Sequence, residues 1–194
     1  QGGYGGSISQ FSGIHTPSGY IFVDHLQGKI FKLNQNIEEL SAQGLQVFLN
    51  NNLKAYFDPT TKRYTDNPYL PGSKGALAVY DGFHKRYILT NHDGDNSFTL
   101  SYSFIANRFR SFHSYLPNCY VSNDNRFFAI NNAETQISLF EHDKGQYLKF
   151  YNNSTKSPFE LHFVENAQGQ TIIPDNMVIN SICKSADEKT YIHL

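Results

Sequence analysis

The stretch from Tyr80 to Asn118 constrains the fold most, because short strand-like runs alternate there with residues typical of tight turns. Within it, residues Phe98 to Ser103 alternate apolar with small polar side chains, which is the period-two pattern of a half-buried strand. The predicted turns lie at residues 80–82, 92–96 and 106–107. The stretch therefore predicts two consecutive β-hairpins, and it contains no arrangement of residues built for catalysis.

Short strands separated by turns continue along most of the chain, at a spacing of roughly 8 to 12 residues. They are expected at residues 20–24, 29–33, 119–122, 126–130, 136–142, 146–151, 158–164, 171–173, 177–182 and 190–193. The composition agrees with a β-rich fold, since Tyr and Phe favour pleated surfaces and the chain holds 13 Tyr and 16 Phe. The pattern predicts an all-β sandwich, barrel or propeller.

A weak internal repeat favours the propeller among these three. An apolar residue and Asp are followed by a turn and a basic strand at Val23-Asp24, and again at Tyr80-Asp81. Propeller blades of four strands need about 40 to 50 residues each, so this length allows about three or four blades. The predicted fold class is mainly β, with propeller-like blades of short antiparallel strands and a small helical insertion.

The helical insertion is expected at about residues 36–53. Asn36 is the predicted N-cap and Glu39 the capping-box residue, and an apolar stripe follows from Leu40 to Leu49. Gly44 weakens the middle, which leaves one helix or two short ones open. Residues 55–75 are predicted to be a long turn-rich loop. The expected organisation is a Gly-rich arm or loop at 1–18, a propeller-like region at 19–164 and short strands at 165–194, completed by another chain or segment.

No catalytic, cofactor-binding or metal-binding residues are predicted, and the chain is not expected to be an enzyme. The eight histidines lack metal-ligand spacing and are expected to face solvent or to be hydrogen-bonded; they are His15, His25, His84, His92, His113, His142, His162 and His193. The turn at His92–Asn96 is the best calcium candidate, but Asp and Gly are ordinary hairpin residues and the turn interpretation is favoured. The turn at Asn123–Asn125 is interpreted in the same way. Paired carboxylates for glycoside hydrolysis have no signal in the sequence.

Charge and cysteine content set further bounds. The net charge of −1 predicts no electrostatic binding to nucleic acid or to an anionic membrane. No apolar run reaches the roughly 18 residues that a membrane-spanning helix needs. Cys119 and Cys183 are expected to be free thiols in a reducing compartment, with a disulfide as the alternative. The start at Gln1 leads us to expect a processed or trimmed piece of a longer chain.

Part of the sequence also resembles a known protein family. Residues Phe98 to Asn118 resemble a segment of the large muzzle or nozzle tail proteins of crAss-like, podovirus-type bacteriophages. Tyr80-Asp81, the strand at 85–89 and Tyr120-Val121-Ser122 follow the order of strand pairs in that family. The similarity extends upstream to Gly19–Leu53 and downstream to about residue 164.

The resemblance implies a structural virion protein that forms part of the muzzle ring around the exit channel for DNA and ejected proteins. It implies copies of the chain, or fragments of the same precursor, in a symmetric ring expected to be six-fold. Neighbouring tail proteins and assembly in the cytoplasm of the bacterial host follow from it. Two alternatives remain open: a carbohydrate-binding or glycan-cleaving propeller module, and a Ca²⁺-stabilised adhesion domain that uses Asp93 and Asp95.

Overall fold

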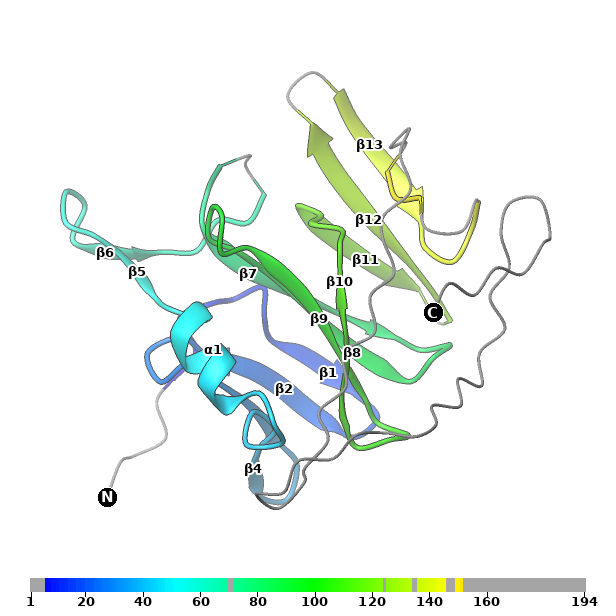
Figure 1. Cartoon of the computed structure of the whole chain (residues 1–194), viewed down its shortest axis with the longest axis horizontal. Coiled ribbons are helices and arrows are strands. Elements are labelled where there is room, and N and C mark those ends of the chain that lie inside the picture. The colour runs from blue at the N-terminus through cyan, green and yellow to red at the C-terminus, as the bar shows by residue number, and fades with distance from the viewer. Residues whose placement is uncertain (1–5, 70–71, 124, 134–135, 146–148, 152–194) are drawn as a thin grey trace, which may run out of the picture. The chain divides into compact units, whose positions relative to one another are not determined.

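The computed structural model describes residues 6–69, 72–123, 125–133, 136–145 and 149–151. The chain divides into two units, residues 1–143 and residues 144–194, and every helix and strand named below belongs to the first. The described part is mainly β and consists of several small antiparallel sheets (Figure 1). In the described residues no helix has the length and apolarity needed to cross a membrane.

Three sheets contain most of the strands, and in each of them the strands follow one another in chain order. The first sheet contains β1 (Ile14–Thr16), β2 (Gly19–Asp24), β3 (Lys29–Leu33) and β4 (Ile37–Glu39). The central sheet contains β7 (Gly75–Asp81), β8 (Arg86–His92), β9 (Phe98–Ser103) and β10 (Arg108–His113). The third sheet contains β11 (Cys119–Asn123), β12 (Arg126–Ala133) and β13 (Gln136–Glu141). The predicted pair of hairpins between Tyr80 and Asn118 is confirmed, and so are the hairpins at 20–33 and 119–130.

Strands β7, β8 and β9 of the central sheet are buried on both faces because they lie between the other two sheets, whereas β10 is largely exposed (Figure 1). Tyr87 and Leu89 of β8 point into a core shared with Ile21 and Val23 of the first sheet. The intervening Ile88 points the other way and packs with Val79 and Phe127, the last of these from the third sheet. Apolar side chains at successive positions of β8 are thus explained by two separate cores.

One type of hairpin turn occurs four times in the described residues. The last residue of the first strand accepts backbone N–H groups of the turn through its side chain, and the residue before the return strand has a positive φ of 51° to 63°. A Lys or Arg then begins the return strand, opposite the capping residue. The four pairs are Asp24–Lys29, Asp58–Arg63, Asp81–Arg86 and Ser103–Arg108. The two-fold repeat predicted from the sequence is therefore one local structure with four examples.

The helix differs from its prediction. Residues 37–39 form β4, which pairs with β3, so Asn36 is not an N-cap. Glu39 binds Lys29 across the sheet, with 2.8 Å between Oε2 and Nζ, and does not close a capping box. The single helix of the described residues, α1, covers only Gln46–Asn52 and has no side-chain cap. Leu40 and Leu49 are buried in the first core as the stripe predicted, but Leu40 reaches it from a turn.

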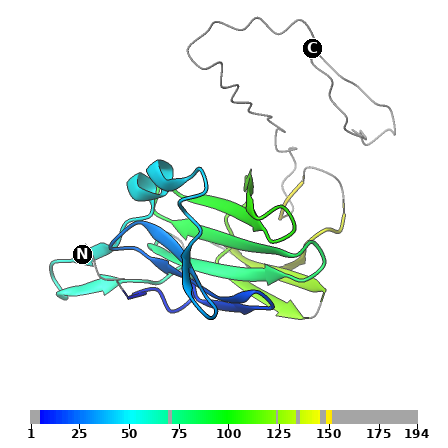
Figure 2. The same cartoon turned by 90° about the horizontal axis from the view of Figure 1, so that it is seen from below.

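The long loop expected at 55–75 contains a hairpin of its own, formed by β5 (Tyr56–Asp58) and β6 (Arg63–Thr65). This hairpin projects away from the three sheets (Figures 1 and 2). The prediction of a strand at 146–151 is wrong for residues 149–151, the part of this range that the structure describes, because they form no strand. The strands expected at 158–164, 171–173, 177–182 and 190–193 lie outside the described residues.

Candidate functional site

The strongest cluster of charged side chains surrounds Asp81, at the end of β7. Its carboxylate is 1% exposed and accepts the backbone N–H groups of Phe83 and His84. It also binds His84 Nδ1 at 2.8 Å and Arg86 Nε at 2.6 Å. Burial raises the pKa of Asp81, but the hydrogen bonds from His84 and Arg86 outweigh this and lower it overall.

Asp81, His84 and Asp143 place one ligand atom each within 4.8 Å of one another, close enough for a metal ion to be considered. However, Arg86 already supplies a positive charge to both carboxylates, at 2.6 Å from Asp81 and 3.9 Å from Asp143. A cation would have to displace or approach that guanidinium. The arrangement is therefore an ion-pair network that closes a hairpin turn and ties it to the end of β13.

Two half-buried histidines lie beside this network. Burial, with a smaller contribution from Arg86, lowers the pKa of His113 and of His142 to about 4. His142 stacks on Phe127 with 4.2 Å between ring centroids, and His113 stacks on Tyr115 at 5.0 Å. Nε2 of His113 is buried without a hydrogen-bond partner in the described residues. The expectation that the histidines face solvent or are hydrogen-bonded is wrong for this nitrogen, because strands distant in sequence enclose it.

Side chains of the turn at His92–Asn96 are bound by other groups of the protein. Lys74 pairs with the Asp93 carboxylate, and the Asp93 N–H donates to Ser97 Oγ at 2.9 Å. Nε2 of His92 lies 2.7 Å from the carbonyl oxygen of Pro117. These contacts agree with the turn interpretation of this segment. In the turn at Asn123–Asn125, Asn123 pairs with Arg126, while Asp124 lies outside the described residues.

A shallow polar cleft lies where β5 and β6 leave the sheets. Its lining includes His25, Asp66, Lys74 and Asn91. Asp66 accepts hydrogen bonds from Ser9 Oγ and from the N–H groups of Gln10 and Ala76. The carboxylate of this cleft therefore holds the N-terminal segment against β7.

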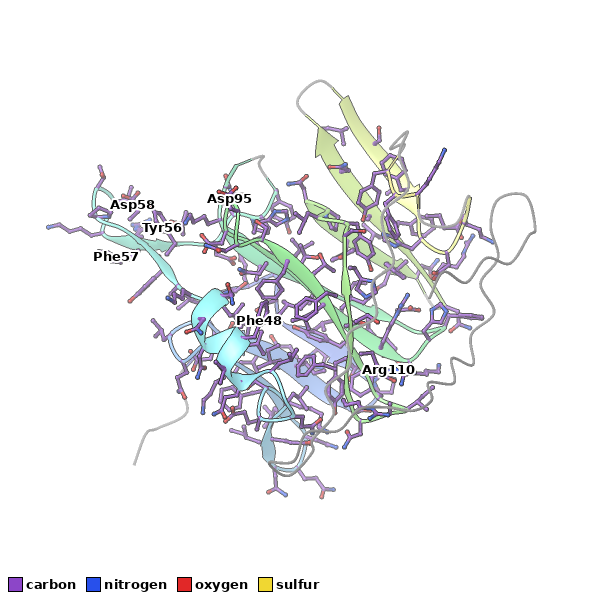
Figure 3. The ribbon with its side chains drawn as sticks, in the orientation of Figure 1. Phe48, Tyr56, Phe57, Asp58, Asp95 and Arg110 are labelled. Carbon is purple, nitrogen blue, oxygen red and sulfur yellow. The ribbon has the colours of Figure 1, made fainter. Side chains whose placement is uncertain are left out.

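Large apolar side chains are exposed at several places in the described residues, and two of these places carry three such side chains each. The first is the projecting hairpin, where Tyr56, Phe57 and Tyr64 are each close to half exposed. Figure 3 labels Tyr56 and Phe57 on this hairpin. The second is the outer face of the third sheet, where Val121, Ile137 and Leu139 are 49%, 71% and 62% exposed. Exposed apolar patches of this kind mark contact surfaces. The sequence predicted strands for the third sheet but a loop for residues 55–75, and it did not show which side chains stay exposed.

Cys119, on the third sheet, is a free thiol, and burial raises its pKa. Cys183 lies outside the described residues, so the expectation of two free thiols and its disulfide alternative both stay predictions.

Fold and surface together define a β-rich module with contact surfaces and internally paired charges. The sequence profile of the crassvirus muzzle proteins matches residues 3–133, which is more than half of the chain. The chain therefore belongs to the crassvirus muzzle protein family, whose members are components of the virion tail. No curated protein matches it.

Proposed function

We propose that this chain is a structural subunit of the phage tail muzzle, placed in a ring around the exit channel for DNA and ejected proteins. The single observation that carries the proposal is the family match, which extends from before β1 to the end of β12 and so includes the strands of the first two sheets entirely. The function follows from the family; the structure adds surfaces suited to assembly.

The sheets support a propeller-like architecture as part of this proposal. The first and central sheets each contain four antiparallel strands in chain order, as a propeller blade does. The third sheet contains three such strands and packs on the central one. In the proposal, residues 1–18 are an arm or loop, residues 19–164 the propeller-like region, and residues 165–194 short strands completed by another chain or segment.

The partners in this proposal are other copies of the chain, or fragments of the same precursor, in a six-fold ring, together with neighbouring tail proteins. The ring forms in the bacterial cytoplasm and serves genome ejection without catalysis. Basic and acidic residues number 16 and 17, so the charge suits a wall past which DNA slides without specific binding.

Imaging of purified particles tests the proposal directly. Tail particles are examined by electron cryomicroscopy, and their proteins are identified by mass spectrometry. We expect peptides of residues 6–133 in the particles and density that fits the three sheets at the free end of the tail. Absence of the chain from the particles, or its density elsewhere in the virion, would refute the proposal.

A carbohydrate-binding module used in host adsorption is the second candidate, and the projecting hairpin is the observation that favours it. Phe57 and Tyr64 stack edge to face with 5.3 Å between ring centroids, and exposed aromatic rings of this kind also suit a sugar ring. A glycan array decides between the two functions: binding that Phe57→Ala abolishes supports this candidate, and no binding removes it.

A further inference from the structure

We propose that the contact between the central and third sheets is an acid-sensitive switch. Protonation of His113 and His142 releases the third sheet from the central sheet, while the central and first sheets stay packed on each other. The switch lies within the described part of a single chain, so it is independent of the ring proposed above.

A continuous row of aromatic rings joins the two sheets. It starts at His113 of β10, which stacks on Tyr115 with 5.0 Å between ring centroids. Tyr115 packs edge to face with His142, which follows β13, at 4.7 Å. His142 then stacks on Phe127 of β12 at 4.2 Å. Two of these four rings are imidazoles, which are the side chains that gain a positive charge in mild acid.

The closed packing suits a neutral His113 and not a charged one. Its Nε2 is buried and has no hydrogen-bond partner in the described residues. A neutral imidazole tolerates this, because only one of its two nitrogens carries a proton. An imidazolium has two N–H donors, and a buried donor without an acceptor costs free energy. Protonation of His113 therefore opposes the closed contact.

The charges of the central sheet also oppose an imidazolium at this place. The positive charge of Arg86 on β8 acts against protonation of both rings, and a charge on His142 acts against one on His113. Asp81 of β7 attracts a charge on His142, but its carboxylate already pairs with Arg86 at 2.6 Å. Opposite His113, β9 contributes the uncharged Thr99.

On the side of the third sheet, two carboxylates are the sequence neighbours of His142. Glu141 pairs with Arg126 at 3.6 Å, and Asp143 lies 3.9 Å from Arg86. Both carboxylates therefore already have a cationic partner. The other rings packed on His142 carry no charge; they are Tyr115, Tyr120 and Phe127.

The third sheet is packed less extensively on the central sheet than the first sheet is. In the described residues, twelve buried side chains form the core on the side of the first sheet, and three form the core towards the third sheet. A hydrogen bond between the hydroxyls of Thr90 and Tyr120, at 2.8 Å, adds to the smaller core. An opening that exposes few apolar side chains costs less than one that exposes many. Acid therefore opens this contact before the rest of the fold.

The opening has a defined pH range. In the closed form burial and Arg86 lower the pKa of both histidines to about 4, and in the open form it returns to about 6.5. The closed form is therefore fully favoured above pH 6.5 and becomes less favoured as the pH falls towards 4. At pH 5 each histidine shifts the ratio of open to closed form about 30-fold towards the open form.

Hydrogen exchange of the full 194-residue chain at pH 7 and at pH 5 tests the switch, with rates corrected for the intrinsic pH dependence of exchange. We expect the protection of the β11, β12 and β13 amides to fall at least tenfold at pH 5. The amides of β8 and β9 are expected to keep their protection. Unchanged protection of the third sheet, or an equal loss in all three sheets, overturns the inference, and this measurement needs no variant.

Histidine variants then identify the groups that respond to acid. His113→Phe and His142→Phe keep an aromatic ring that does not titrate, and the double variant is expected to retain the protection of the third sheet at pH 5. His15→Phe is the matched control, because this histidine lies exposed on β1, and it should respond to acid as the unaltered chain does. The readout is the difference between pH 7 and pH 5 within each variant, so a general change in stability does not imitate it. A double variant that still loses tenfold protection at pH 5 overturns the inference.

Discussion

Removing the Asp81 carboxylate tests how the repeated hairpin turn is stabilised. The four turns share one backbone geometry, but Asp81 is buried and binds two charged or chargeable side chains, whereas Asp58 closes the same turn on the exposed hairpin. The variant is Asp81→Ala, and Asp58→Ala is its matched control. Both variants delete a carboxylate that is followed four residues later by the same Lys-Arg pair.

The expected loss follows from the contacts of Asp81. Breaking a buried ion pair by removing one partner costs about 3–5 kcal/mol, because the other charge is left without compensation. Arg86 keeps a contact with Asp143 at 3.9 Å and is itself about one-fifth exposed, so the lower end applies. We expect Asp81→Ala to lose about 3 kcal/mol of unfolding free energy. For a protein of this length that corresponds to a fall in Tm of about 6–12 °C.

Thermal and urea unfolding measure this loss, with tyrosine fluorescence and circular dichroism as probes because the chain has no Trp. Asp58→Ala is expected to leave the unfolding midpoint nearly unchanged, since its carboxylate bonds lie in solvent. A loss below about 1 kcal/mol for Asp81→Ala would show that the ion-pair network contributes little. Equal losses for both variants would show that the turn, and not the buried network, carries the stability.

Three further predictions concern acid, glycine and calcium. In the folded protein the pKa of His113 and of His142 is about 4, below the unfolded value near 6.5. The free energy of unfolding is therefore highest above pH 6.5 and falls towards pH 4, by about 2 kcal/mol per histidine at pH 5. A His142→Phe variant whose stability has the same acid sensitivity in urea titrations would contradict this. Gly28→Ala should lower Tm far more than Gly94→Ala, because both have positive φ but only the first would place Cβ 2.8 Å from the backbone of α1; equal shifts would disprove the steric argument. Millimolar Ca²⁺ should leave Tm unchanged, since Lys74 already neutralises Asp93; a rise of several degrees that Asp95→Asn removes would restore the calcium hypothesis.

The sequence predicted the hairpins because their causes are local. A capping side chain, a residue that tolerates positive φ and an alternating strand lie within a few positions of one another. The spacing Asp-x-x-x-Lys-Arg at Asp58 and at Asp81 was a further signal, and it would have revealed the β5–β6 hairpin inside the predicted loop. Residues 36–39 show the opposite case: helix-capping chemistry predicted a helix start, but pairing with β3 placed these residues in a sheet.

The charged network and the contact surfaces depended on distant parts of the chain. Asp81 meets Asp143 through the position of β13, and His142 reaches Phe127 because β12 and β13 pair. No local pattern carries that information.

The sequence by itself determined that this protein is built from short antiparallel hairpins of a muzzle-like chain, since turn chemistry and period-two alternation act over a few residues. Only the tertiary structure decided which faces those hairpins bury. The apolar residues of β8 and of the third sheet look alike in sequence, but β8 lies between two sheets, whereas the described residues cover the third sheet on one side. Burial is set by what the rest of the chain places against a strand, which is why the uncovered face at Ile137 and Leu139 became visible only in three dimensions.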